Sequence, residues 1–208
     1  MLVGENRLPQ SFYEAYDTRT LAQKLLGCEL VHNSPDGITS GTIVETEAYL
    51  QDDPACHAYQ KRTPRTEPMY AAPGTIYVYL IYGMYQCVNV VSNRVDCGEA
   101  VLIRALQPTE GIEIMQIRRE LSRKKTLGKV SKPIPLKELC RGPGKLVQAM
   151  GIERSVHNSQ SLVDSNLFIT PPLSGNPFEI EISKRIGLTQ GADFLYRYSL
   201  KNNPFVSR

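Results

Sequence analysis

The sequence lacks several features that would assign it at once to a simple class. No apolar run is long enough to cross a bilayer, and the first residues, MLVGENRLPQ, lack the basic and apolar segments of a signal peptide. Five cysteines, an odd number without a CxxC pair, argue against a disulfide framework or a zinc knuckle. No His, Cys and carboxylate cluster has metal-ligand spacing, so neither a metal nor another cofactor is expected. We therefore expect an intracellular protein with buried, reduced thiols and no membrane partner.

Length and composition fit one compact domain. The chain has 208 residues, of which 41% are hydrophobic and 22% charged, ordinary values for a globular protein with a sizeable core. There is no internal repeat and no linker between two cores. We expect a single domain over residues 1–208 that acts as a monomer.

The charge is small overall but unevenly distributed. The net charge is +3, yet residues 118–145 hold ten basic and only two acidic side chains, while the rest of the chain carries a net −5. Such asymmetry favours a face that binds a polyanion such as a nucleic acid. The alternative is a solvated helix and loop with a chance excess of lysine.

Local signals predict short strands and helices in alternation. Either Asp17 or Thr18 is placed to cap a helix that Gly27 ends, and Pro143 suits the first position of a helix that Gly151 ends. We predict helices over 18–26, 108–121 (with Ile114, Ile117 and Leu121 inward) and 143–150, strands over 28–32, 41–50, 99–106, 179–186 and 194–200, and a hairpin over 74–91. These elements give an α+β fold, a single mixed domain with a mainly antiparallel sheet, surrounding helices and a protruding β-hairpin.

One predicted strand, in the run IVETEAYL, carries two carboxylates among apolar residues. Alternation puts Ile43, Glu45, Glu47 and Tyr49 on one face, so Glu47 and Tyr49 are neighbours. A carboxylate in such a strand needs a partner or a catalytic task. Glu47 could form a salt bridge with Arg104, or act as a general base that activates water. Glu45 and Glu47 could also form the acid pair of a carbohydrate glycosidase.

The tip of the predicted hairpin is rich in large side chains. Two β-branched and aromatic runs flank a glycine-containing turn that carries Tyr82, Met84 and Tyr85. A soluble protein seldom exposes such residues on a turn unless they enter something. They suggest a wedge that opens a base stack, although Tyr82 could instead pack on its own sheet. Two registers stay open, one pairing Tyr79 with Val88 and the other pairing Tyr79 with Asn89.

Two further segments have functional potential. The polar, proline-rich stretch 51–73, which contains His57 and Arg65, is expected to form a long loop, and such loops in compact domains are more often functional than idle. The run GPGK that ends at Lys145 starts a helix with a basic residue, which offers a phosphate site or a plain helix cap. It lacks the full P-loop pattern, so binding of a nucleoside triphosphate is disfavoured.

Several of these runs together resemble one known family. IVETEAYL, Cys56-His57, PGTIYVYLIYGMYQCVNV, LIRAL and RGPGKLVQAMGI are similar to motifs of the alkyladenine (3-methyladenine) DNA glycosylase family, and the matching blocks cover nearly the whole chain. The resemblance implies the same mixed fold with a protruding hairpin. It further implies a monofunctional base-excision enzyme that acts on double-stranded DNA. Its substrates would be alkylated or deaminated purines such as 3-methyladenine, 7-methylguanine and hypoxanthine, flipped out of the helix.

The resemblance also implies roles for individual residues. The family's catalytic glutamate stands directly before Ala-Tyr and corresponds to Glu47, with Arg104 and the main-chain carbonyl of Ile186 holding the water beside it. Tyr82 corresponds to the residue that fills the hole left by the flipped nucleotide. The base pocket corresponds to Tyr49, His57, Tyr79 and Asn89. The further residues expected to contact DNA are Met84 and Tyr85 in the minor groove and, from their charge, Arg65, Lys124, Lys125 and Lys145.

Two other interpretations use the same residues. A non-catalytic DNA-bending protein would use the same wedge, and a carbohydrate glycosidase would use Glu45 and Glu47. No lysine lies in the pocket motifs, so a Schiff-base step that cleaves the DNA strand is not supported. A DNA glycosylase is expected in the cytoplasm, at the nucleoid of a bacterium, or in the nucleus of a eukaryote.

Overall fold

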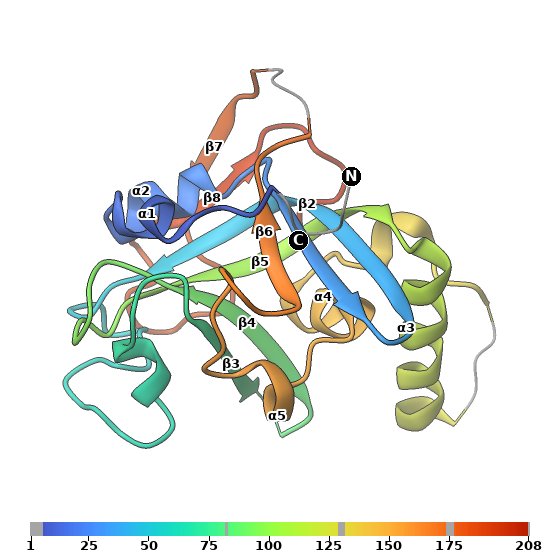
Figure 1. Cartoon of the computed structure of the whole chain (residues 1–208), viewed down its shortest axis with the longest axis horizontal. Coiled ribbons are helices and arrows are strands. Elements are labelled where there is room, and N and C mark those ends of the chain that lie inside the picture. The colour runs from blue at the N-terminus through green and yellow to red at the C-terminus, as the bar shows by residue number, and fades with distance from the viewer. Residues whose placement is uncertain (1–5, 82, 129–131, 174–176, 208) are drawn as a thin grey trace.

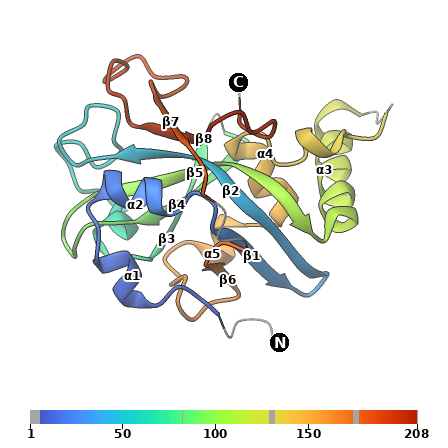
Figure 2. The ribbon, with the colours of Figure 1, turned by 90° about the horizontal axis from the view of Figure 1, so that it is seen from above.

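The strands of the chain form one antiparallel sheet (Figures 1 and 2). The computed structural model describes residues 6–81, 83–128, 132–173 and 177–207. Its strands are β1 (Glu29–Ser34), β2 (Gly37–Tyr49), β3 (Ile76–Ile81), β4 (Tyr85–Val91), β5 (Ala100–Glu110), β6 (Leu167–Thr170), β7 (Ile180–Ser183) and β8 (Arg197–Leu200). Their order is β3-β4-β5-β2-β1-β6, with β8 paired to both β2 and β7. The predicted α+β class with a mainly antiparallel sheet is confirmed.

Short helices pack around this sheet. In the described ranges they are α1 (Gln10–Glu14), α2 (Thr18–Lys24), α3 (Ile112–Leu127), α4 (Pro143–Met150) and α5 (Arg154–His157), with 3-10 turns η1 (Glu67–Tyr70) and η2 (Leu136–Glu138). Figure 1 shows α1 and α2 at one end of the molecule and α3 at the other, with α4 in contact with both α3 and the sheet. Of the two predicted candidates, Asp17 caps α2, because its carboxylate accepts the backbone N–H groups of Arg19 and Thr20. Gly151 ends α4 in the left-handed conformation, as predicted.

Strand β2 organises the sheet. It pairs with β5 along most of its length, with β1 through its first half, and with β8 at residues 45–47. The register with β5 shifts between Ile43 and Thr46, where β2 changes from β1 to β8. Such bulges re-aim side chains and are frequent beside active sites. The predicted alternation is therefore wrong for Ile43, which packs in the main core with Ala48 instead of sharing the face of Glu47.

The β3–β4 hairpin extends past the edge of its neighbour. Strand β4 pairs with β5 only at residues 89–91, so its first four residues reach beyond that ladder. This is the protruding hairpin that was predicted, and Tyr82, in its connection, lies outside the described residues.

Both predicted registers of the hairpin are wrong. Ile81 pairs with Tyr85, so three residues connect the strands, and Tyr79 pairs with Cys87. Tyr79 and Asn89 still share one face, because Asn89 pairs with a residue two positions from Tyr79 and side chains alternate along a strand.

The helix predicted over 108–121 starts later than expected. Strand β5 continues to Glu110, where the Thr109 hydroxyl donates to the buried carboxylate of Glu29. The buried face of α3 is set by Met115, whereas Ile117 and Leu121 are 58% and 55% exposed and were wrongly placed inward. The spacing of the apolar residues predicted the wrong inner face for this helix, because its buried side chains include both the apolar Met115 and the basic Arg119.

Two clusters of buried side chains form the core. The larger one packs α2 and α4 against the sheet. The smaller one fixes the long loop 51–73 against β3 and β4, and consists of Cys56, Ala58, Met69, Tyr70, Tyr77, Val91 and Ala100. All five cysteines are free and buried. Within the described ranges, no helix has the length and apolar character needed to traverse a bilayer.

Candidate active site

Glu47 is completely buried, and its carboxylate accepts two hydrogen bonds and forms one ion pair. The Tyr49 hydroxyl donates to Oε2 at 2.7 Å, and the Ile186 amide donates to Oε1 at 3.0 Å. Arg104, on the neighbouring strand β5, places Nη1 3.2 Å from Oε1. An ionised carboxylate offers about four acceptor positions, so the described donors leave acceptor capacity on Oε2. The contact that the structure shows for Ile186 is through its N–H, while the predicted role of its carbonyl stays a prediction.

Glu45 is used differently. Its carboxylate accepts from Arg104 Nε at 3.2 Å, from Arg197 Nε at 2.6 Å, and from the backbone N–H and hydroxyl of Ser207 at 2.7 and 2.9 Å. The predicted salt bridge between Glu47 and Arg104 is present, but Arg104 bridges both carboxylates. Glu45 is thus a fully engaged structural anchor, an arrangement that argues against two equivalent glycosidase acids.

A cavity of about 260 Å³ opens beside the partners of Glu47. Its lining includes the predicted residues Tyr49, His57, Tyr79, Asn89, Arg104 and Ile186. Glu47 itself does not line the cavity. It lies behind this wall, because the three residues that contact its carboxylate, Tyr49, Arg104 and Ile186, all line the cavity. The size is near the lower end for small-molecule pockets, which begin at about 300 Å³, and suits a single flat ring system.

Aromatic rings form one side of the cavity. The ring centroids of His57 and Tyr79 are 4.4 Å apart with an interplanar angle of 78°, and those of Tyr77 and Tyr79 are 5.5 Å apart. His57 Nδ1 lies 3.0 Å from the Tyr77 hydroxyl, and the Asn89 side-chain amide donates to the Tyr77 carbonyl at 3.0 Å. Sequence reasoning missed Tyr77, although its position two residues before Tyr79 on one strand places both on the same face.

The aromatic and imidazole side chains of the cavity lining are uncharged at neutral pH. Burial, with a smaller contribution from the charge of Arg65, lowers the pKa of His57 to about 4, so its ring is uncharged at neutral pH. Burial and the adjacent Glu47 carboxylate raise the pKa of Tyr49, so its hydroxyl stays protonated and donates. Burial likewise raises the pKa of Tyr79. The cavity therefore combines uncharged aromatic surfaces with the Arg104 guanidinium in its lining and the Glu47 carboxylate behind its wall.

The residues predicted to contact DNA lie outside this cavity. Met84 is 58% exposed at the hairpin connection. Tyr85 is 39% exposed and packs against the start of α4, where a Cβ at Gly144 would meet Cβ and Cδ1 of Tyr85 at 3.3 Å. Arg65 approaches the hairpin, with Nη2 3.4 Å from the Leu80 carbonyl.

The predicted basic residues differ in their pairing. Lys145 Nζ lies 2.7 Å from a carboxylate oxygen of Glu138, so the start of α4 carries an ion pair. Lys124 and Lys125 are exposed in the last turn of α3, and no ion pair of the described residues includes them. In Figure 1 this end of α3 and the β3–β4 connection point to the same side of the molecule. Among the described residues, no group of three or more His, Cys, Asp or Glu is placed to hold a metal.

Comparison with known proteins identifies the family. A family model described as methylpurine-DNA glycosylase matches residues 11–204. The chain belongs to the methylpurine-DNA glycosylase family. Membership makes it a DNA glycosylase, a DNA-repair hydrolase of N-glycosyl bonds.

Similar curated proteins come from distant organisms. A protein of Methanoculleus marisnigri is 44% identical over 204 residues, covering 97% of this chain and 98% of the relative. One of Carboxydothermus hydrogenoformans is 42% identical over 204 residues, with the same coverage. One of Francisella tularensis is 44% identical over 190 residues, covering 90% of this chain and 92% of the relative. Each of the three bears the name "Putative 3-methyladenine DNA glycosylase".

Proposed function

We propose that this DNA glycosylase, acting as a monomer, removes alkylated and deaminated purines from double-stranded DNA without cleaving the strand. The assignment of its relatives to 3-methyladenine supports the substrate class. The observation that carries the proposal is the position of Glu47, held by three donors directly behind a cavity with neutral aromatic walls. No lysine is among the described residues that line this cavity, which supports hydrolysis by water over a covalent Schiff base.

The cavity accounts for recognition of the base. A damaged purine turned out of the helix would lie against Tyr49, His57 and Tyr79, and base–aromatic stacking contributes about 1–3 kcal/mol per base. The buried Asn89 amide is fixed by its bond to the Tyr77 carbonyl, so it offers a rigid polar contact at the floor. Rigid polar contacts of this kind discriminate between bases that differ in one exocyclic group.

Glu47 would supply the chemistry. Breaking an N-glycosyl bond develops positive charge on the sugar, and a buried carboxylate stabilises that charge. Oε2 can also accept the proton of an attacking water while Arg104 and the Ile186 amide hold Oε1. Cationic alkylated purines leave readily as neutral bases, so this arrangement acts on them without an additional acid.

The decisive experiment replaces Glu47 by glutamine. Glu47→Gln keeps the shape and should lower single-turnover base release from alkylated duplex DNA by about 10²–10⁴-fold, the usual contribution of a general base, with DNA binding retained. Glu29→Gln is a matched control, since Glu29 is a buried glutamate in the same sheet whose carboxylate, among the described residues, accepts from threonine hydroxyls alone. Near-normal turnover by Glu47→Gln, or an equal loss in Glu29→Gln, would refute the assignment of Glu47.

A further inference from the structure

Arg185 lies behind the candidate active site, with its guanidinium enclosed by protein. The residue is 5% exposed and does not line the cavity. Nη1 donates to the Ala48 carbonyl at 3.0 Å, and Nη2 donates to the Gly191 carbonyl at 3.1 Å. Both terminal nitrogens bond to the carboxylate of Asp53, which is 1% exposed. One side chain thus joins the end of β2, the loop after β2 and the loop after β7.

Two of the three donors to Glu47 depend on this side chain. The guanidinium carbon of Arg185 lies 4.6 Å from the ring centroid of Tyr49, whose hydroxyl donates to Glu47 Oε2. The next residue in the chain, Ile186, donates its amide to Glu47 Oε1. The third donor, Arg104, is held separately by Glu45.

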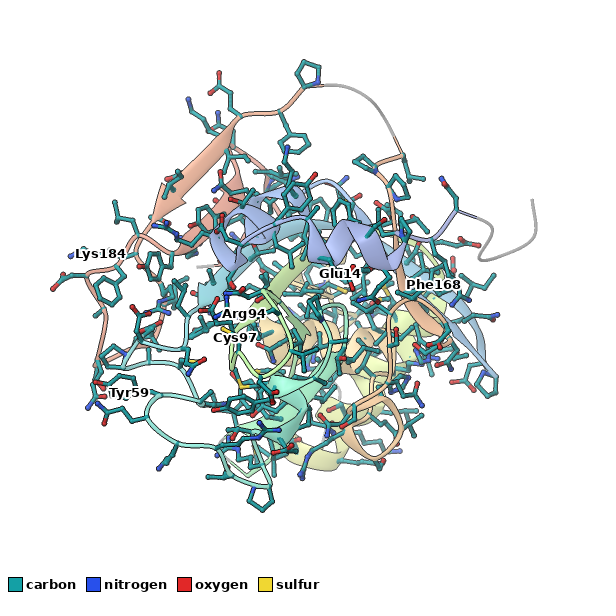
Figure 3. The ribbon with its side chains drawn as sticks, turned by 60° about the vertical axis from the view of Figure 1, so that its left-hand side comes forward. Glu14, Tyr59, Arg94, Cys97, Phe168 and Lys184 are labelled. Carbon is teal, nitrogen blue, oxygen red and sulfur yellow. The ribbon has the colours of Figure 1, made fainter. Side chains whose placement is uncertain are left out.

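Asp53 extends the same connection to the cavity wall. Its carboxylate neutralises Arg185 and also accepts the backbone N–H of Ala55 at 3.0 Å. Ala55 and His57 both line the cavity, so the loop that carries them is tied to the guanidinium. Figure 3 shows Tyr59, from the loop after β2, and Lys184, from the loop after β7, on the same flank of the molecule.

We propose that Arg185, paired with Asp53, is a positioning residue for base release that never touches the substrate. It holds the Tyr49 hydroxyl and the Ile186 amide in place, and these two groups hold the Glu47 carboxylate. The proposal rests on the function proposed above for Glu47. Loosening the two donors lets the carboxylate move relative to the sugar, and displacements of about 1 Å in a reacting group can cost about a hundredfold in rate.

Two variants test the inference without leaving a buried charge unpaired. Arg185→Lys keeps the charge but cannot make the planar, forked contact with Asp53 or stack flat on Tyr49. The double variant Asp53→Asn/Arg185→Met removes both charges together, which proteins tolerate better than loss of one partner. The side-chain oxygen of the introduced asparagine can still accept the backbone N–H of Ala55.

A matched control exists at another aromatic ring. Arg7 lies 4.1 Å from the ring centroid of Phe168 and donates to the Ser165 carbonyl, so Arg7→Met removes a contact with an aromatic ring and a bond to a carbonyl, as a change of Arg185 does. In Figure 3, Phe168 lies on the opposite side of the view from Lys184, the neighbour of Arg185.

Amide exchange measured by NMR gives a readout that does not depend on activity. In both Arg185 variants the Ile186 amide should exchange at least about tenfold faster, because its bond to Glu47 opens locally. The core amide of Ile43, bonded to the Cys28 carbonyl at 2.8 Å, should exchange as in the unchanged chain. Equal acceleration at both amides would reveal only a general loss of stability and would overturn the proposal, as would an unchanged Ile186 amide.

Kinetics give the second readout. The single-turnover rate of base release should fall about tenfold to a hundredfold in both Arg185 variants, while affinity for lesion DNA stays near that of the unchanged chain. Arg7→Met should alter neither. A loss of affinity at an unchanged rate, or an equal loss of rate in Arg7→Met, would contradict a positioning role. If the unchanged chain released no base, the proposed function would fail, yet the exchange comparison would still decide whether Arg185 holds the two donors.

Discussion

Tyr49 donates its hydroxyl to the Glu47 carboxylate at 2.7 Å, and the two residues are separated by a single position on β2. Side chains two positions apart on a strand project from the same face, so the strand itself brings a stacking ring and a buried carboxylate together. Tyr49 also lines the cavity, which makes it a direct structural connection between the cavity and Glu47.

Removing only this hydroxyl should separate chemistry from binding. Tyr49→Phe keeps the ring, so affinity for lesion DNA should be nearly unchanged. Base release should slow by about 10- to 100-fold, because a hydrogen bond to a charged group contributes about 1.5–3 kcal/mol. Tyr13→Phe is the control, since the Tyr13 hydroxyl is buried without a partner among the described residues. Weaker binding at an unchanged single-turnover rate would show that Tyr49 only stacks.

A buried histidine pair predicts a loss of stability in acid. His32 Nδ1 lies 2.7 Å from the Met150 carbonyl, which can only accept, so this nitrogen carries the proton. The Nε2 atoms of His32 and His157 lie 3.2 Å apart, so His157 must donate. Its Nδ1 is then free to accept the Glu153 amide at 3.0 Å. Protonating His32 at Nε2 would place its N–H opposite the N–H of His157 Nε2, so the hydrogen bond between the two rings would be lost.

The direction of the pH effect follows from both histidines. Burial lowers the pKa of His32 and of His157 below the ordinary value of 6.5. The unfolded chain therefore binds more protons as pH falls below about 6.5, so the pair's contribution is complete above that pH and is lost in acid. The free energy of unfolding should fall by up to about 1.4 kcal/mol per pH unit for each extra proton. Urea unfolding from pH 7 to pH 5 should show a steeper decline for the unchanged chain than for His157→Gln, and parallel curves would disprove the pairing effect.

At the end of α3, Lys124 and Lys125 have no ion-pair partner among the described residues. Glu138 bonds Lys145, whereas Lys124 and Lys125 are exposed. Lys124→Gln/Lys125→Gln should weaken binding to all duplexes alike and flatten the salt dependence by up to about two units, one for each lost phosphate contact. Lys24→Gln/Lys201→Gln is the control, because α2 lies at the other end of the molecule in Figure 1 and Lys201 is paired with Glu179. An unchanged slope would mean that the end of α3 is only a solvated surface.

The sequence predicted best those elements whose position is determined by interactions between neighbouring residues. The helix that Asp17 caps and the helix that Gly151 ends were both predicted from these capping and terminating residues. The short elements α1, α5 and β6 were missed, because four or five residues carry too little periodicity to stand out. The bulge in β2 was missed as well, since it arises from the change of partner from β1 to β8 and no residue in IVETEAYL signals it.

For the candidate site too, residues in local motifs were predicted, whereas contacts between distant parts of the chain were not. The motif residues that line the cavity, such as Tyr79 and Asn89, were named from the resemblance, and their roles stay predictions. The contacts that support them are distant in sequence: Arg185 meets Asp53 across 132 positions, and Ser207 meets Glu45 across 162. No local pattern contains such pairs, because they exist only after the sheet has brought the loops together.

The hairpin connection gives the last prediction. Met84 is exposed there, and the strand that follows reaches past β5, so the connection can enter a groove without disturbing the sheet. Unstacking a base costs a few kcal/mol, and an inserted side chain offsets part of this by filling the hole. We expect Tyr82→Ser to lower the flipped population of a fully paired lesion by about tenfold, which corresponds to about 1.4 kcal/mol.

The effect of Tyr82→Ser should depend on how well the lesion is stacked. The loss of flipping should be smaller for a lesion opposite a gap, where less stacking is lost. The chemical step should be intact, because Glu47 lies on a different strand. A fluorescent base analogue reports flipping, and single-turnover release on the same duplexes reports chemistry. Val95→Ser is the control, since Val95 is 56% exposed outside the hairpin. If Tyr82→Ser left both the fluorescence and the release rate unchanged on paired DNA, Tyr82 would be an ordinary turn residue. Met84→Ser would then show whether the hairpin enters the DNA.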